Sequence, residues 1–127
     1  MFFSNKLLKW YKKNDAQYPW RSTNNPYHVW ISEVMLQQTQ ANTVIKYYNN
    51  WVNKFPNISS VAKAPPDDIL KSWEGLGYYA RARNFHLACK KLYDKGLNEV
   101  PNNYNEFIQL PGVGEYTAAA VISIAYN

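Results

Sequence analysis

Glu33 is the residue of this chain best placed for acid chemistry. Its neighbours include Val29, Trp30 and Val34, in a segment that is apolar on nearly every side. A carboxylate is rarely buried without a reason, and burial raises its pKa so that it holds a proton near neutral pH. Such a group is suited to general acid catalysis. Two alternatives stay open: a partly exposed Glu33, or a structural ion pair with Arg21.

The segment that follows Glu33 is dense in polar side chains. Gln37, Gln38, Thr39 and Gln40 follow one another directly, although core packing needs no such run. Amide side chains can reach the edges of bases, or fill the gap that an unstacked base leaves. A solvated helix turn is the alternative interpretation.

Residues 104–121 predict a helical hairpin. An amphipathic segment leads into Leu110-Pro111-Gly112-Val113-Gly114, and a helix rich in small residues follows. The glycines permit a tight turn whose backbone N–H groups point outward at a helix N-terminus, which suits a phosphate oxygen and reads no base. We place a candidate helix-hairpin-helix motif at about 104–126; a plain glycine-rich connector is the alternative.

Residues 75–83, GLGYYARAR, combine flexibility, flat rings and positive charge. Two glycines precede Tyr78 and Tyr79, and Arg81 and Arg83 follow. Aromatic rings beside arginines are typical of sites that hold an unstacked nucleic-acid strand. This pattern predicts a second nucleic-acid contact.

Helices must position these residues, because helical periodicity dominates the chain. Residues 41–55 and 83–94 each place apolar side chains at spacings of three and four, and Pro, Gly and Asn clusters separate the segments. The sequence predicts an all-α fold of about seven helices with no sheet. The segment 116–127 is apolar nearly all round, so we expect further protein to cover it.

Composition narrows the function classes. The chain has 127 residues, with 14 Lys and Arg against 9 Asp and Glu, and its net charge of +5 favours an anionic partner. Its one cysteine, Cys89, is expected to be buried, and a four-thiolate metal or iron–sulfur site cannot form within this chain. We expect no membrane segment and no signal peptide, and therefore a cytoplasmic protein.

The ordered set of motifs resembles the adenine DNA glycosylase family of the helix-hairpin-helix base-excision repair superfamily. The resemblance runs from Trp10-Tyr11 to the end of the chain, through PWR at 19–21, SEVMLQQTQ at 32–40, GLGYYARAR at 75–83 and LPGVGEYTA at 110–118. It implies the helix-hairpin-helix glycosylase fold, mostly the half that forms a six-helix barrel. It also implies that Glu33 is the catalytic acid, which protonates a flipped adenine.

The resemblance implies binding roles for further residues, in three groups. By this resemblance, the adenine pocket is formed by Trp20, Arg21, Leu36 and Tyr116. The gap in the stack and the opposite strand are contacted by Gln38, Thr39 and the wedge Tyr78, with Leu76 nearby. The DNA backbone is bound by Gly112, Val113 and Gly114.

Tyr116 separates two branches of the family. Relatives resembling endonuclease III carry a lysine nucleophile at this position, and a phenol cannot form the Schiff base that an amine forms. The chain therefore resembles the monofunctional branch. The simpler role of Tyr116 is helix packing, which is compatible with this one.

Three family features are missing from the sequence: a second carboxylate that stabilises the cationic sugar, four cysteines for a [4Fe-4S] cluster, and a C-terminal recognition domain. We expect residues 1–127 to be the N-terminal part of a catalytic domain, inactive alone, with the cluster in the full-length protein. The expected partner is double-stranded DNA with adenine opposite 8-oxoguanine or guanine. We expect a monomer, nucleoid-associated if bacterial.

Two other functions stay open. One is a non-catalytic helix-hairpin-helix module that binds duplex DNA without releasing a base. The other is a glycosylase with lyase activity, like endonuclease III, against which Tyr116 argues.

Overall fold

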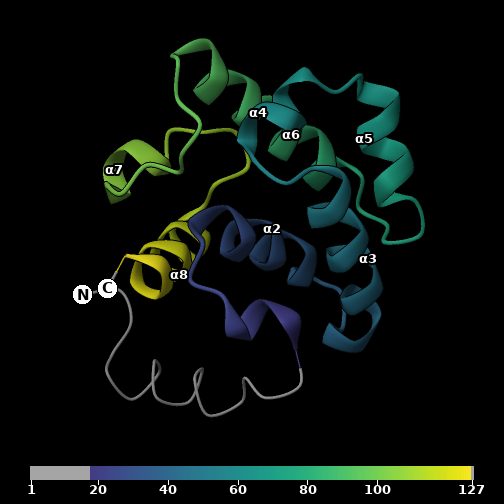
Figure 1. The fold of residues 1–127 in the computed structure, drawn as a ribbon. Helices are drawn as coiled ribbons and strands as arrows, with labels where there is room; N and C mark the ends of the chain where they lie inside the picture. The colour runs from purple at the N-terminus through teal and green to yellow at the C-terminus, as the bar shows by residue number, and fades with distance from the viewer. Residues whose placement is uncertain (1–17, 127) are drawn as a thin grey trace.

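The computed structural model of the chain describes residues 18–126. In this range one 3-10 helix and seven α-helices form, with no β-strand (Figure 1): η1 (Pro19–Ser22), α2 (Pro26–Leu36), α3 (Ala41–Lys54), α4 (Ile58–Lys63), α5 (Pro66–Trp73), α6 (Ala80–Asp94), α7 (Tyr104–Phe107) and α8 (Glu115–Ala125). The predicted fold class and the approximate number of helices are confirmed. The expected start of the resemblance, at Trp10-Tyr11, lies outside the described residues.

Asparagine caps start several of the helices. The Asn25 side chain accepts hydrogen bonds from the backbone N–H groups of Tyr27 and His28, at 2.9 and 3.2 Å. Asn57 forms a capping box at the start of α4, and Asn103 caps α7. Each cap satisfies N–H groups that have no partner within the helix, so the Asn clusters mark helix starts.

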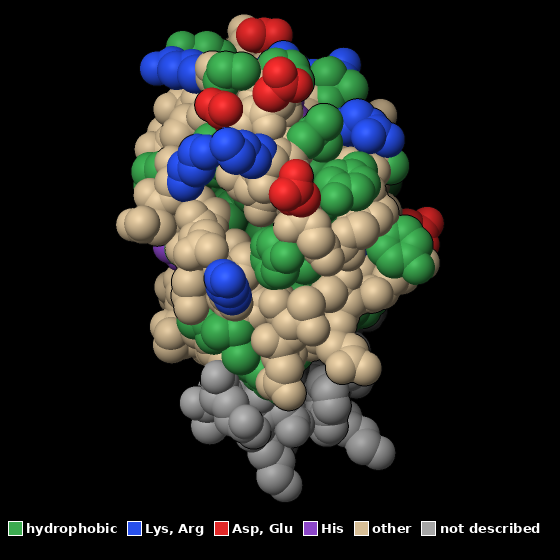
Figure 2. All heavy atoms as spheres, turned by 90° about the vertical axis from the view of Figure 1, so that its right-hand side faces the viewer, with side chains coloured by type: hydrophobic (Ala, Val, Ile, Leu, Met, Phe, Trp, Pro, Cys, Tyr) green, Lys and Arg blue, Asp and Glu red, His purple; other side chains and the backbone are tan. Residues whose placement is uncertain are grey.

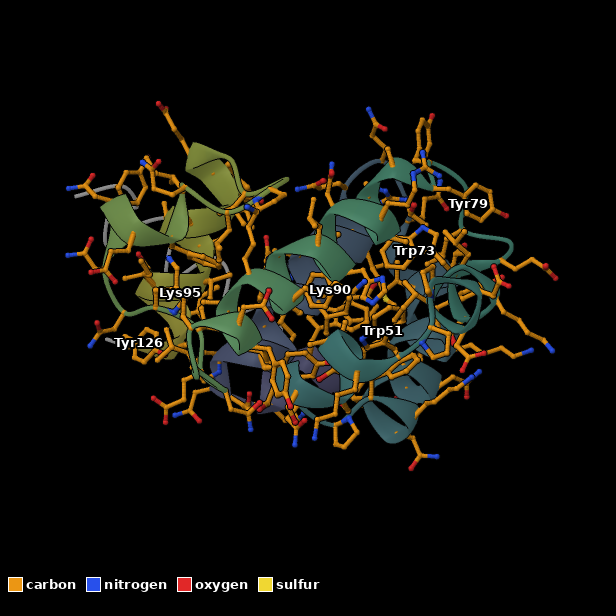
Figure 3. The ribbon with its side chains drawn as sticks, turned by 90° about the horizontal axis from the view of Figure 1, so that it is seen from above. Trp51, Trp73, Tyr79, Lys90, Lys95 and Tyr126 are labelled. Atoms are coloured by element: carbon orange, nitrogen blue, oxygen red, sulfur yellow. The ribbon has the colours of Figure 1, made fainter. Side chains whose placement is uncertain are left out.

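The core is built around α2, which lies at the centre of the fold between α3, α6 and α8 (Figure 1). Trp30 of α2 packs against Phe85 of α6, with ring centroids 4.4 Å apart, and against Phe107 of α7, at 5.2 Å. Trp51 and Trp73 meet edge to face at 5.8 Å in the same core (Figure 3). Most residues of α2 are buried, and the polar residues Ser32 and Glu33 are among them.

The predicted apolar stripes face this core. Val44, Tyr48 and Phe55 of the 41–55 segment are buried, as are Phe85 and Cys89 on α6. Burial of Cys89, expected from its position, is confirmed. One face of α8 packs along α2.

The surface charge is mixed on the face that carries α3 and α5. Figure 2 shows Lys and Arg side chains interspersed with Asp and Glu across that face. No stripe of one sign dominates it, so the net charge of +5 does not by itself locate a partner there. No helix within residues 18–126 is long and apolar enough to cross a lipid bilayer.

The hairpin joins α7 to α8 and rests on α6. The first helix is shorter than the amphipathic segment suggested, because residues 108–110 continue as turns. Gly112 has a φ of +75°, and a Cβ added to it would lie 2.7 Å from Cβ of Asn84 on α6. Backbone conformation and close packing therefore both require glycine at this position.

Gly112→Ala is predicted to destabilise the protein more than Gly96→Ala. Gly96 has a similar φ of +78°, but nothing lies within 4 Å of an added Cβ. The control should cost about 1–2 kcal/mol for the left-handed backbone alone, and Gly112→Ala should cost about 1–3 kcal/mol more for overpacking against Asn84. Urea unfolding of both variants measures the difference; equal losses would contradict the packing of Gly112 on α6.

Candidate nucleic-acid interface and acid site

Glu33 lies inside the fold. It is only 6% exposed, on the C-terminal half of α2. Burial raises the pKa of the Glu33 carboxyl to about 7, although the positive charge of Arg21 acts in the opposite direction. Desolvation outweighs the ion-pair attraction, so the carboxyl holds a proton near neutral pH. The predicted burial is confirmed, and Arg21 lies within electrostatic reach as well.

Arg21 and Tyr116 complete a titratable cluster with Glu33. Burial lowers the pKa of Arg21 while Glu33 raises it; burial and the charge of Glu33 both raise the pKa of Tyr116. The three side chains come from η1, α2 and α8, which meet because both η1 and α8 pack against α2. The structure thus brings together the predicted acid and two of its four predicted pocket residues.

The other two predicted pocket residues are less accessible. Trp20 is almost fully buried; its ring stacks on Tyr18 with centroids 5.0 Å apart and meets Tyr48 edge-on at 5.5 Å. Leu36, at the end of α2, is half-buried against the core.

Two loops carry residues with unusual backbone conformations. Gln38 and Tyr78 have φ values of +61° and +52°, and they are the non-glycine residues with positive φ in residues 18–126. Such conformations cost on the order of 1–3 kcal/mol and cluster at functional sites. Tyr78 is 60% exposed and Gln38 is exposed, whereas Leu76 is buried. The side chains of Gln38 and Tyr78 are thus accessible to a partner, whereas Leu76 belongs to the core.

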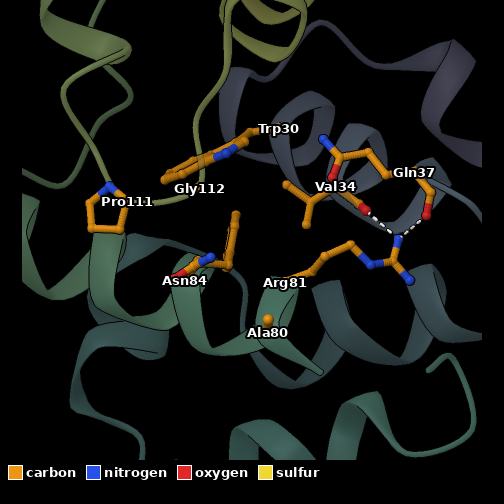
Figure 4. Close-up of a pocket in the computed structure, with 9 residues that line it drawn as sticks. Trp30, Val34, Gln37, Ala80, Arg81, Asn84, Pro111 and Gly112 are labelled. Carbon is orange, nitrogen blue, oxygen red and sulfur yellow. Dashed lines mark hydrogen bonds between the residues drawn. The ribbon is translucent and has the colours of Figure 1, made fainter. Parts of the chain in front are cut away.

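Arg81 does not serve as the surface charge that the sequence suggested. Its guanidinium turns inward and donates hydrogen bonds to the carbonyl oxygens of Val34, at 2.7 Å, and Gln37 (Figure 4). It donates to the carbonyl oxygen of Met35 as well, at 3.1 Å. It also donates to the Thr39 hydroxyl at 3.1 Å. The expectation was wrong for Arg81 because the C-terminal carbonyls of α2 need donors, and α2 has no basic residue in its own last turn. Arg83 is exposed.

A crevice of about 130 Å³ separates α2 from the hairpin, lined in part by Trp30, Gln37, Asn84 and Gly112 (Figure 4). Gln37 closes one end, where its side-chain amide donates to the Thr117 hydroxyl at 3.0 Å. The sequence left Gln37 open between base contact and a solvated turn; in the structure its side chain joins the end of α2 to α8. The sequence alone gave no indication of this bond, since its partners are 80 residues apart.

The hairpin presents backbone at the start of α8. Gly114 is the N-cap of α8, and open space surrounds its Cα. Val113 is buried beneath the turn. No side chain caps α8, and free N–H groups at a helix start can donate to an anion.

The residues present do not fit a [4Fe-4S] cluster. Cys89 is the one cysteine of the chain, and it is buried on α6. Within residues 18–126, no group of three or more His, Cys, Asp or Glu side chains is close enough to hold a metal ion. A four-thiolate cluster therefore has no ligand set here.

Comparison with known proteins adds the family. Residues 31–123 match HhH-GPD, the superfamily of base excision DNA repair proteins. The chain belongs to this superfamily. The match contains Glu33, both strained loops and the hairpin.

Two curated relatives of this HhH-GPD chain share a name. The adenine DNA glycosylase of Buchnera aphidicola subsp. Baizongia pistaciae is 46% identical over 128 residues, covering 100% of this chain and 36% of the relative. The adenine DNA glycosylase of Homo sapiens is 40% identical over 134 residues, covering 98% of this chain and 24% of the relative. The chain therefore spans about a third or less of these proteins.

Solved structures share the fold. A thermostable thymine-DNA glycosylase superposes with a TM-score of 0.83 at 31% identity, over 94% of this chain and 55% of that one. A trapped endonuclease III–DNA covalent intermediate superposes with a TM-score of 0.76 at 25% identity, over 98% of this chain and 61% of that one. The HhH-GPD fold is thus supported by sequence and by structure.

Burial of Glu33 predicts a specific pH dependence of stability for this HhH-GPD chain. A folded-state pKa of about 7, above the ordinary value of 4.5, means that Glu33 contributes stability below pH 4.5 that is lost as the pH rises through 7. Glu33→Gln stays neutral, so relative to wild type it should gain roughly 2–3 kcal/mol between pH 5 and pH 8.

Urea unfolding at the two pH values measures this gain. Glu74→Gln, at an exposed position after α5, is the control and should show a much smaller change. An equal change in both variants would contradict burial of the Glu33 carboxyl as its cause.

Proposed function

We propose that this chain carries the acid-bearing part of a DNA glycosylase that removes adenine opposite 8-oxoguanine or guanine. The observation that carries the proposal is the buried Glu33 carboxyl, with its pKa raised to about 7, beside Arg21 and Tyr116. Within residues 18–126, Glu33 is the one acidic side chain that is buried. The names of the curated relatives support adenine as the base.

Chemistry at this site begins when the adenine leaves the base stack and enters beside Glu33. Glu33 donates its proton to a ring nitrogen as the bond between C1′ and N9 breaks, and the electron pair leaves with the neutral base. Water then attacks C1′ of the cationic sugar and loses a proton, leaving an abasic site. We propose that a second carboxylate, outside residues 18–126, stabilises the cation.

Binding to double-stranded DNA would use two features of different kinds. The N–H groups at the start of α8, after Gly114, suit backbone phosphate and read no sequence. The exposed Gln38 and Tyr78 are suited to the gap in the stack and to the opposite base. The solved endonuclease III structures that share this fold are DNA complexes, which supports DNA as the partner.

The remaining parts of the proposal concern the whole protein. We propose a monomer that acts in the cytoplasm, on nucleoid DNA if its source is bacterial. The [4Fe-4S] cluster expected from the resemblance would need cysteines other than Cys89, and no step above depends on it.

Glu33→Gln is predicted to abolish adenine release. In the complete gene product, the single-turnover rate on a duplex with adenine opposite 8-oxoguanine should fall at least about 100-fold, because the amide cannot donate the proton of an acid. In the wild type the rate should fall as the pH rises above about 7, where Glu33 loses its proton. Glu99→Gln, exposed in the loop after α6, is the control. A wild-type rate in Glu33→Gln would overturn the role of Glu33; no release by the wild type would favour a binding module.

The likeness to endonuclease III makes a lyase the second candidate. Tyr116 favours the glycosylase without lyase activity, because it carries a phenol at the position where a lyase needs an amine. Borohydride treatment during the reaction is predicted to trap no covalent adduct between the complete gene product and DNA, while endonuclease III, as positive control, is trapped. An adduct would favour the lyase.

A further inference from the structure

One side chain connects the two strained loops. Arg81, the second residue of α6, donates to Gln37 and Thr39 in residues 37–40 and to the carbonyl of Gly77, at 3.4 Å, in residues 74–79. Gln38 lies between its first two partners and Tyr78 follows the third. The two loops are far apart in sequence and meet at this guanidinium.

The guanidinium is fixed from several directions. It lies over the rings of Trp73 and Tyr78, with centroids 5.3 and 5.4 Å from Cζ. The next residue, Ala82, is fully buried, as is Phe85 one turn further along α6. A planar group with five N–H donors can serve carbonyls on several sides at once, which an ammonium on a flexible stem cannot do in the same way.

We infer that Arg81 is a positioning residue that sets Gln38 and Tyr78 at a defined separation, so that both side chains enter the duplex together as the target base leaves the stack. This inference rests on the proposed function, because it assigns both loops to DNA. Arg81 itself contacts neither DNA nor the reacting atoms.

The physical basis is strain that the guanidinium holds in place. Gln38 and Tyr78 both have left-handed φ values, which residues other than glycine rarely adopt. Without Arg81 the Gln37 carbonyl and the Thr39 hydroxyl lose a charged donor, and each loop can relax independently of the other. Glu33 is on the same helix as the carbonyls that Arg81 binds, but its side chain interacts with Arg21 and Tyr116. Loss of Arg81 should therefore impair opening of the duplex rather than proton transfer.

The experiment uses the complete gene product with Glu33→Gln, so that no base is released. The probe is a duplex with 2-aminopurine opposite 8-oxoguanine, whose fluorescence rises when the base leaves the stack. Arg81→Gln and Arg81→Lys are compared with Lys91→Gln, which also removes one positive charge, at an exposed position in the last turn of α6. Titration of bound duplex gives the dissociation constant and the fluorescence rise per bound complex.

Arg81→Gln should weaken binding of the duplex about tenfold or more, because ordering the loops again on binding costs about the free energy of the charge-assisted hydrogen bond that is lost. It should also remove about half or more of the fluorescence rise per bound complex. Arg81→Lys keeps the charge without the planar fork and should be intermediate. Lys91→Gln should keep the full rise. Where Arg81→Gln fails to fold, Arg81→Lys decides.

A wild-type rise per bound complex in the Arg81 variants would overturn the inference, even if less protein folds, because a purely structural role lowers the amount of binding-competent protein and not the signal of each complex. Adenine release by the protein without Glu33→Gln is measured separately. Its absence would count against the proposed function, whereas the contrast between Arg81 and Lys91 reports on the loops alone.

Discussion

Enclosure of α2 on nearly all sides is the constraint on which the rest of the structure depends. Because α3, α6 and α8 all pack against it, the side chains in the middle of α2 are removed from water, Ser32 and Glu33 among them. Its four last carbonyls need donors, and its one carboxylate must stay neutral or be paired. The fold meets these demands in two places, with Arg81 at the end of the helix and Arg21 beside Glu33.

The two arginines affect their surroundings in different ways. Arg81 is surrounded by oxygen atoms and rings, and its guanidinium donates hydrogen bonds to backbone carbonyls rather than to a carboxylate. Arg21 acts on Glu33 but does not overcome the cost of burying the carboxylate, and the pKa of Glu33 stays near 7. Stronger pairing would ionise Glu33 and leave it no proton to donate. An acid in this position needs a weak partner rather than a strong one.

Local patterns predicted what depends on local spacing. Burial of Glu33 and Cys89 follows from apolar neighbours along one helix, and the Asn clusters mark helix starts by satisfying N–H groups two or three residues away. The hydrogen bonds of Arg81 could not be predicted from local spacing, because the oxygens that accept them lie some 40 residues earlier in the sequence. Burial of Leu76, beside an exposed Tyr78, likewise depends on how the loop turns after α5.

Gln38 and Tyr78, the non-glycine residues with left-handed backbone in residues 18–126, lower the folding stability of the chain. Glycine would relieve the backbone at Gln38 and Tyr78, yet both positions carry large side chains, and the Tyr78 ring lies against Arg81. Glycine does occupy position 112, where the chain must pass close to Asn84 and no side chain is needed. Strain is therefore avoided where only packing is required and retained where a side chain must project from the surface. That contrast is what separates a loop shaped for contact with a partner from one shaped for the fold alone.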